Sequence, residues 1–315
     1  MPIPPELLLI PQNPFKTYWP DIACTREHIM DPLATHTLRV QQTSSSSSTR
    51  SAFGSHTSSS TLTPLSRPRV LRLIVSEALS RVQDQPTPQL GISLVLEAMR
   101  CHHALWIAGI HHTDISLENV MVRIRRTPNR APHFSGIVND WDLAPSVNSV
   151  PARTGTIPFM HPELLTEEYW AGKIPPLYLH ANTSFIWVMA FLVLRYENGK
   201  IIPSPSLPFD DLITSNYNKA RRIKFDVSRL WTSSCPSGAE QEWAVVLDLL
   251  FWTARTAQER SHVLTRAEYR NNLEDIQKLL TTDDALAVYD KFWKIVKGSA
   301  MEMGLDYLIT MHNKR

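Results

Sequence analysis

The sequence predicts an α+β fold, because short strand-like segments come first and helical patterns follow. Val70–Val75 (VLRLIV) is rich in β-branched residues and is typical of a buried strand. Residues 119–124 and 136–139 are two further strand-like segments, and the chain after Pro162 is mostly helical in pattern, without an internal repeat. Strands followed by helices favour this class over a doubly wound sheet, in which the two alternate.

Apolar residues at helical spacing predict the main helices. A helix is expected from Pro88 to Ala108, ending at Gly109, since glycine is a common residue after the last helical turn. Ser184–Tyr196 is the most apolar segment and is expected to form a buried helix, because its apolar run is too short to span a bilayer. Three amphipathic helices are predicted at residues 239–256, 265–281 and 283–297.

Length and composition place the chain among ordinary globular proteins. Its 315 residues, 43% hydrophobic and 20% charged, allow one large two-lobed domain or two smaller ones. A net charge of +2 is too small to indicate a nucleic-acid or anionic-membrane partner. The three cysteines are far apart, which favours a reducing intracellular compartment, cytoplasmic or nuclear, and the N-terminal residues lack the basic region of a signal peptide.

Residues 43–67 form a serine-rich segment of low complexity. Such a segment buries too little apolar surface to offset the entropy of ordering it. We expect a disordered insertion, and we favour a spacer over a cluster of phosphorylation sites. The histidines His102, His103, His111 and His112 show no paired metal spacing and are expected on a helix surface or in loops.

Three motifs in the middle of the chain carry the candidate chemistry. They are His112–Asn119 (HTDISLEN), Asp140–Ala144 (DWDLA) and Thr154–Glu163 (TGTIPFMHPE). Phosphoryl transfer needs a carboxylate near the acceptor hydroxyl and oxygen ligands that hold magnesium against the phosphates. An Asp five residues before an Asn can supply the carboxylate and one ligand from a single loop, and an Asp after the next strand can supply the main ligand. Each motif alone is weak, but their order and spacing together are specific.

These segments resemble the fungal-type protein kinase family, within the protein kinase superfamily. The resemblance covers about residues 70–200 well and rests on HTDISLENVMV (112–122), VNDWDLA (138–144), RTGTIPFMHPELL (153–165) and SFIWVMAFLVLRYENGK (184–200). It implies a two-lobed, protein-kinase-like fold. A reduced N-terminal lobe is expected at residues 1–80 around the insertion at 43–67, a helical C-terminal lobe at 81–300, and a tail at 301–315 whose last residues fray.

The resemblance also implies roles for single residues. Asp114 would accept or orient the substrate hydroxyl, while Asn119 and Asp140 would bind Mg²⁺. ATP would be the phosphate donor, and a protein substrate or signalling partner would be bound. Glu163 matches a glutamate that pairs with a later arginine, for which Arg255 and Arg260 are the candidates.

Thr154 and Thr156 lie where the family has a substrate-docking or phosphorylatable segment. Some nearby positions depart from the family pattern. Thr113 replaces the usual arginine of the catalytic loop, which argues against control by activation-segment phosphorylation. Ala181 replaces an aspartate that braces this loop, so the backbone N–H groups of the loop should lose an acceptor.

The N-terminal region departs further from the pattern. Gly54 is the only glycine before Gly91, so a glycine-rich loop over the phosphates is absent from these residues. Lys16 is the only lysine before Lys173 and is therefore the candidate for the ATP-binding lysine, with Glu27 as its partner. An ordinary surface lysine is the equal alternative for Lys16.

Three functions remain open from the sequence. The first is a serine/threonine-type protein kinase that uses magnesium ATP. The second is a pseudokinase, a binding or scaffold module without turnover, which the missing glycine-rich loop and Ala181 favour. The third is a small-molecule phosphotransferase of the aminoglycoside-kinase type, against which the segment from Thr154 to Glu163 argues.

Overall fold

The computed structural model describes a large part of the chain. The described residues are 32–39, 70–76, 78–141, 154–202, 211–213, 216–225, 238–270 and 282–313, with Asn272, Glu274, Ile276 and 278–279. The expectations for Lys16, Glu27 and the 43–67 insertion lie outside these residues. The chain divides into two compact units, and each is described by itself.

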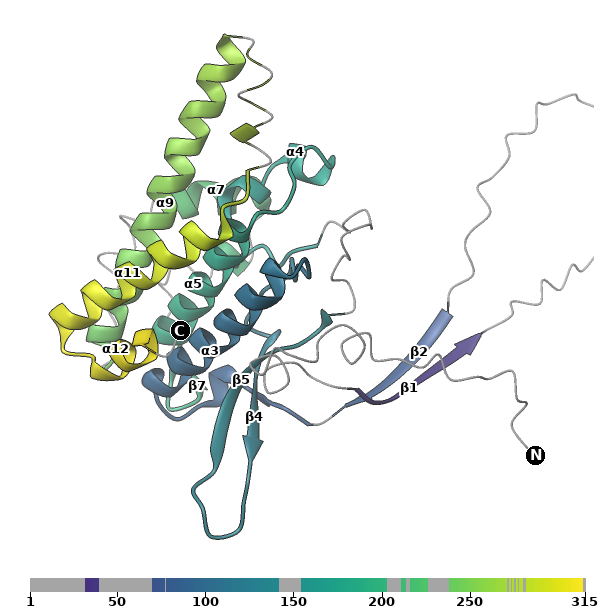
Figure 1. Ribbon diagram of the computed structural model, residues 1–315, viewed down its shortest axis with the longest axis vertical. Helices are drawn as coiled ribbons and strands as arrows, with labels where there is room; N and C mark the ends of the chain where they lie inside the picture. The colour runs from purple at the N-terminus through teal and green to yellow at the C-terminus, as the bar shows by residue number, and fades with distance from the viewer. Residues whose placement is uncertain are drawn as a thin grey trace, which may run out of the picture. The chain divides into compact units, whose positions relative to one another are not determined.

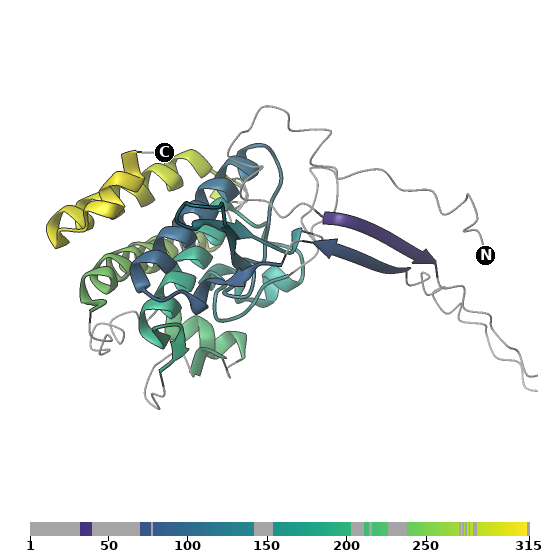
Figure 2. The same ribbon diagram turned by 90° about the horizontal axis from the view of Figure 1, so that it is seen from below.

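The first unit contains a two-stranded antiparallel sheet. Strand β1 (Pro32–Arg39) pairs with β2 (Val70–Ser76), and the register places Arg39 opposite Val70. A register shift between Pro32 and Ala34 marks an irregularity at the other end of the ladder. Figure 2 shows the two strands side by side. The strand predicted at Val70–Val75 is confirmed.

The second unit combines a small antiparallel sheet with a set of helices (Figure 1). The sheet order is β3 (Ser80–Arg81), β4 (Val120–Arg125) and β5 (His133–Val138). The strands predicted at 119–124 and 136–139 are confirmed. Strand β5 begins earlier than predicted because His133 pairs with Arg125 at the end of the ladder next to the connecting loop.

Helices make up most of the second unit. Their combination with small antiparallel sheets is compatible with the α+β class. The longer helices are α3 (Pro88–Ile107), α5 (Tyr178–Arg195), α7 (Tyr217–Phe225), α9 (Glu240–Tyr269), α11 (Ala285–Met303) and α12 (Asp306–Asn313). The short elements are η1 (Val82–Asp84), η3 (Pro162–Leu164), α4 (Glu167–Trp170), β6 (Tyr196–Glu197) and β7 (Lys200–Ile201).

Helix α3 follows its sequence signals closely. The Thr87 side chain accepts a hydrogen bond from the N–H of Leu90, and Pro88 occupies the first turn, where a missing N–H costs nothing. The helix ends just before Gly109, whose φ of +85° suits glycine. The predicted helix from Pro88 to Ala108 is therefore confirmed.

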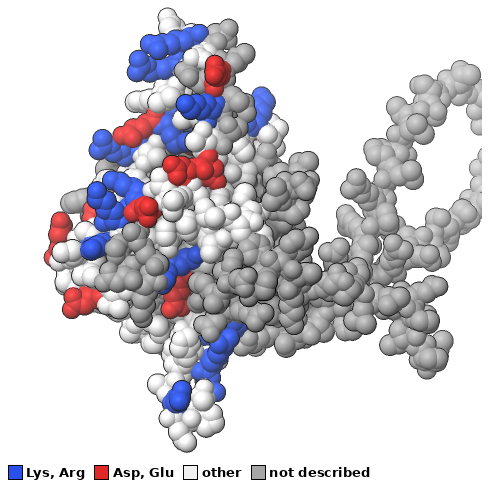
Figure 3. Space-filling model, viewed as in Figure 1, with Lys and Arg blue, Asp and Glu red and all other residues white. Residues whose placement is uncertain are grey.

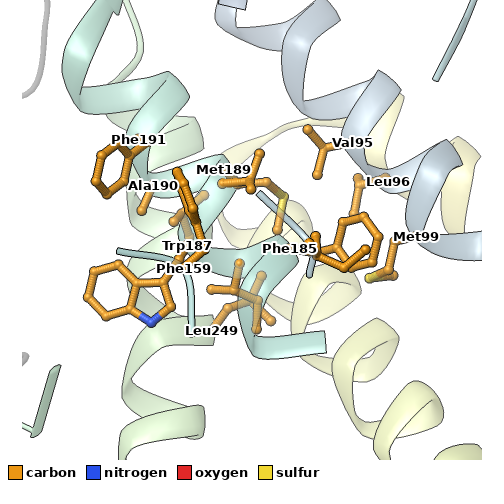
Figure 4. Packing of buried hydrophobic residues seen from close by; sticks show 14 of the residues in the cluster. Val95, Leu96, Met99, Phe159, Phe185, Trp187, Met189, Ala190, Phe191 and Leu249 are labelled. Carbon is orange, nitrogen blue, oxygen red and sulfur yellow. The ribbon is translucent and has the colours of Figure 1, made fainter. Parts of the chain in front are cut away.

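Helix α5 is the centre of the core. Every residue from Tyr178 to Leu194 is buried, as expected for a helix that is apolar on all sides. It begins six residues before the predicted Ser184, because the polar residues of its first turns are also enclosed by neighbouring elements. Figure 4 shows side chains of α3, α5 and α9 meeting in this core, including Val95, Leu96, Met99, Phe185, Met189 and Leu249.

One prediction for the C-terminal region was wrong. Helix α9 runs without a break through residues 257–264, where we predicted a gap between two helices. Residues 257–264 are mostly polar, yet the helix continues through them, because intrahelical hydrogen bonds can also form in a largely solvated stretch. Within the segment expected as a C-terminal tail, residues 306–313 form α12, and Leu305 and Leu308 are buried against the core.

Charges of both signs are interspersed on the face of the molecule in Figure 3. Lys and Arg side chains lie next to Asp and Glu along the helices of the second unit. The described part of this face therefore has no large area of a single sign.

Gly136 lies where β5 packs on α3. A Cβ atom there would lie 1.8 Å from the carbonyl oxygen of Leu94, which is backbone and has little freedom to move. We expect Gly136→Ala to lower the free energy of unfolding by about 3 kcal/mol, measured by urea denaturation. Gly298→Ala on α11 is the control, since a Cβ there meets nothing within 4 Å and should be neutral or slightly stabilising. An equal effect of both substitutions would contradict the close packing.

Candidate active site

The loop between α3 and β4 carries the first motif in a tight, hydrogen-bonded turn. The N–H groups of Asn119 and Val120 both donate to the carbonyl of Ser116. The Asn119 side chain reaches back along the same loop, and its Nδ2 donates to the carbonyl oxygen of Asp114 at 2.8 Å. This bond uses the amide nitrogen, so Oδ1 of Asn119 remains available as an acceptor.

The carboxylate of Asp114 lies against the third motif. Thr156 Oγ1 donates to Asp114 Oδ1 at 2.8 Å, and the hydroxyls of Thr113 and Thr154 lie 3.0 Å apart. Two neighbouring residues of the loop thus each contact one of the two threonines. The structure brings together Asp114, Thr154 and Thr156, which lie about 40 residues apart in the chain.

Asp140 follows β5 and adjoins the same loop. The N–H of Asn139 donates to the carbonyl of Asn119 at 2.8 Å, which places the residue before Asp140 beside the first motif. Asp140 itself is exposed and has a φ of +62°, an uncommon conformation for a residue other than glycine. Such backbone persists only where the surroundings hold it, and it occurs often at functional sites.

Buried and partly buried aromatic residues support this arrangement. His112 Nε2 hydrogen-bonds to the carbonyl of Asn139 at 2.8 Å, and the ring meets Trp141 edge-on at 4.8 Å. The indole N–H of Trp141 donates to the carbonyl of Val138 at 2.7 Å. His102 Nε2 in turn bonds to the carbonyl of His112 at 3.2 Å. A chain of contacts therefore leads from α3 to the residue before Asp140.

The helix-surface placement predicted for His102 was wrong, because this side chain is buried, whereas His112 lies in a loop as predicted and is also buried. For His102 the sequence contained a usable signal. It lies three residues after Met99 and seven after Val95, on the apolar face of α3. A histidine in that position belongs to the core, where its ring packs against Phe185.

His102 should make the stability of the fold sensitive to acid. Burial, assisted by the charge of neighbouring His112, lowers the pKa of His102 from 6.5 to about 3. The unfolded chain therefore binds the additional proton between these two values, so the free energy of unfolding falls as the pH drops below about 6.5. The slope from this group is about 1.4 kcal/mol per pH unit.

His102→Gln removes the titrating ring but keeps an N–H donor for the carbonyl of His112. Urea denaturation at pH 7, 5 and 4 should give a shallower loss of stability for this variant than for the unmodified protein. Parallel pH dependences for the two proteins would rule out His102 as the source.

Glu163, the last residue of the third motif, forms a partly buried ion pair. Its Oε1 accepts from Arg260 Nε at 2.7 Å, and its Oε2 lies 3.1 Å from His180 Nε2. Arg260 is on α9 and also donates to the carbonyl of Leu279. Of the two arginines predicted as partners, Arg260 is confirmed, whereas Arg255 pairs with exposed Glu259 on its own helix.

His161, Glu163 and His180 form a cluster whose ligand atoms lie within 4.8 Å of one another. Their hydrogen bonds argue against a metal site. Nδ1 of His161 accepts the N–H of Glu163, and Nδ1 of His180 accepts the N–H of Leu177. A ring whose Nδ1 accepts a hydrogen bond carries a proton on Nε2, which leaves no lone pair there for a metal ion. The cluster instead holds the Glu163 carboxylate.

A small cavity lies between the loop of the first motif and α5. Its lining includes Asp114, Ile115, Thr156 and Ala181, and Ala181 is the position where the family pattern has its bracing aspartate. The N–H of Asp114 finds an acceptor in Nδ1 of His112 at 3.3 Å. Part of the bracing that Ala181 cannot supply therefore comes from the loop itself.

Comparison with known protein families decides the assignment. The fungal protein kinase family matches residues 17–193, which is more than half of the chain. The chain belongs to this family. No curated protein matches it.

Membership in the fungal protein kinase family gives the chain a kinase-like, transferase character and implies protein substrates. The family match begins at residue 17 and includes the three motifs of the site. Among the described helices, none combines the length and the apolar character needed to cross a membrane.

Proposed function

We propose that this fungal-type kinase transfers the γ-phosphate of ATP to serine or threonine hydroxyls of a protein. The observation that carries the proposal is the hydrogen bond from Thr156 Oγ1 to Asp114 Oδ1 at 2.8 Å. It supports the proposal because a carboxylate that accepts one aliphatic hydroxyl can accept another from a substrate. The second oxygen, Oδ2, has no hydrogen bond to any described residue.

In the proposed reaction Asp114 orients the acceptor hydroxyl towards the phosphate and takes up its proton. Thr156 fixes one oxygen of the carboxylate, and this restricts the other oxygen to a small range of positions. Thr113 and Thr154 add a second contact between the loop and the segment, so the two move as one unit. Positioning of this kind supplies much of the catalysis in phosphoryl transfer.

Asn119 and Asp140 are the residues proposed to hold Mg²⁺. Both offer oxygen atoms, which this hard cation prefers, and the bond from Asn119 Nδ2 to the backbone leaves its Oδ1 for the ion. Asp140 is exposed next to the loop, where a bound nucleotide could reach it. When bound, the ion would neutralise phosphate charge during transfer.

The N-terminal residues are proposed to form the ATP-binding lobe. The two-lobed kinase fold would place Lys16 near the phosphates, with Glu27 as its ion-pair partner. The antiparallel strands β1 and β2 would belong to this lobe. These assignments rest on the family resemblance and on the uniqueness of Lys16 before Lys173.

A pseudokinase is the second candidate, favoured by Ala181 in the wall of the cavity beside Asp114. A thermal-shift titration separates the two, because bound ligand stabilises the folded state. A shift with magnesium ATP but no phosphate transfer would support the pseudokinase. A small-molecule phosphotransferase is disfavoured, because Asp114 is the only acidic residue lining the described cavity.

The test uses the purified full chain with labelled ATP and Mg²⁺. The acceptor is a peptide library containing serine, threonine or tyrosine in one reaction and an aminoglycoside in another. Label on serine or threonine peptides is expected. Label on tyrosine peptides alone, or on an aminoglycoside alone, would contradict the proposed acceptor. The catalytically impaired variant that completes this test is described in the Discussion.

A further inference from the structure

Lys224 on α7 is a lysine buried almost completely, with only 1% of its surface exposed. Its Nζ donates to the carbonyl oxygens of Pro158 and Met160, each at 2.7 Å. The same atom lies 4.2 Å from the centre of the Trp187 ring on α5. No carboxylate among the described residues forms an ion pair with it.

These contacts use every direction available to the amine. Two N–H groups meet carbonyl oxygens, and the third direction faces an aromatic ring, which attracts a cation. Burial lowers the pKa of Lys224 well below its usual value, because desolvation disfavours the charged form. Both hydrogen bonds survive loss of one proton, since a neutral amine still has two N–H groups.

The two carbonyls belong to the segment that carries Thr156. The N–H groups of Phe159 and Met160 both donate to the carbonyl of Thr156, which closes a turn from Thr156 to Met160. Thr156, at the start of this turn, donates its hydroxyl hydrogen bond to Asp114. Lys224 donates to the carbonyls of Pro158 and Met160 in the second half of the turn. The Phe159 ring packs against Phe191 of α5 and so gives the turn a third anchor.

Stability alone does not account for a lysine here. Burying an amine among apolar groups is costly, and a hydrophobic side chain of similar length would avoid that cost. Such a side chain would leave the carbonyls of Pro158 and Met160 without their described donor, and the turn could then adopt other conformations. The specific effect of Lys224 is therefore on the shape of the turn.

We propose that Lys224 is a positioning residue, which clamps the turn Thr156–Met160 so that the Thr156 hydroxyl stays on Asp114. The turn lies in the expected substrate-docking segment, so the consequence for peptide binding rests on the proposed function. The clamp itself is a property of the fold and can be tested without phosphate transfer.

The first test is hydrogen exchange of the native full chain. Lys224→Met keeps the apolar stem and removes both donors, and it should accelerate exchange of the Phe159 and Met160 amides about tenfold or more. Exchange in α5 should change much less. Lys219→Met is the matched control on the same helix, because Lys219 is exposed and its ion pair among the described residues is with exposed Asp211. It should leave the turn unchanged.

Lys224→Gln provides a second variant if Lys224→Met does not fold. Its amide retains two N–H donors without a charge, so exchange at the turn should lie between the other two rates. Equal exchange at Phe159 and Met160 in the unmodified protein and in either Lys224 variant would overturn the clamp. Equal acceleration throughout α5 and the turn would also overturn it, since Lys224 would then be an ordinary core residue.

The second test measures kinetics with the best peptide from the library. Lys224→Met should raise KM for the peptide about fivefold or more while leaving KM for ATP within about twofold, because the clamp acts on the peptide side. An unchanged peptide KM alongside faster exchange would overturn the link to substrate docking. If the unmodified protein transfers no phosphate, the proposed function fails, and the exchange data still decide the clamp.

Discussion

Asp114→Asn is expected to reduce phosphate transfer at least about 100-fold, because an amide cannot take up the proton of the acceptor hydroxyl. The substitution should preserve the local structure. An asparagine at this position still has an Oδ1 that can accept the Thr156 hydroxyl, and the backbone bond from Asn119 does not involve the side chain of residue 114. Initial rates with labelled ATP and saturating peptide measure the effect.

Glu118→Gln is the matched control for this substitution. Glu118 is an exposed carboxylate in the same loop, and it undergoes the same change from acid to amide without a proposed role in transfer. Its rate should stay within about twofold of the unmodified protein. Thermal unfolding of all three proteins should agree closely. Equal rates for Asp114→Asn and the unmodified chain would eliminate Asp114 as the acceptor of the proton.

Arg260→Gln is expected to lower the free energy of unfolding by about 3 kcal/mol. The Glu163 and Arg260 side chains are only 15% and 18% exposed, so removing the guanidinium leaves a carboxylate that is mostly shielded from water. The hydrogen bond from Arg260 to the carbonyl of Leu279 is lost as well. Urea denaturation at pH 7 measures the difference.

Arg255→Gln is the control for charge alone. Arg255 lies on the same helix, is 80% exposed and pairs with Glu259 four residues later. Exposed pairs contribute little, so this variant should stay within about 0.5 kcal/mol of the unmodified protein. Similar losses for both arginine variants would show that burial of the Glu163–Arg260 pair is unimportant.

The effect of Arg260→Gln should also depend on pH. Burial alone would raise the pKa of Glu163, but the His180 hydrogen bond, the nearby histidines and Arg260 together lower this pKa below its usual 4.5. A lowered carboxyl pKa contributes stability above the unfolded value, and that contribution is lost as the pH falls through the folded value. The difference between the two proteins should therefore shrink once the pH drops below about 4.5.

Local signals account for the parts of the fold that were predicted correctly. Thr87, Pro88 and Gly109 bound helix α3 because capping depends on neighbouring residues. Strands β4 and β5 were likewise recognisable from short apolar runs. The continuity of α9 was missed, since a solvated stretch of helix has no apolar period to detect.

The candidate site likewise contains residues that the sequence predicted and one that it missed. Spacing along the chain identified Asp114, Asn119 and Asp140 as candidates, and it selected Thr156 and Glu163 as members of a second segment. Their catalytic and metal-binding roles remain predictions. Spacing gave no indication of Lys224, because the α7 sequence YNKARRIKF resembles an ordinary solvated helix with four basic residues.

The sequence by itself determined the family of this protein and the order of its three motifs, because both can be recognised along the chain without knowing which residues meet in space. The α+β class that it predicted is compatible with the structure. Only the tertiary structure decided which distant groups meet. Glu163 and Arg260 are 97 residues apart, and Lys224 lies 64 residues from Met160. Contacts of that kind depend on how α5, α7 and α9 pack, and burial of the shared core, rather than any local pattern, fixes that packing.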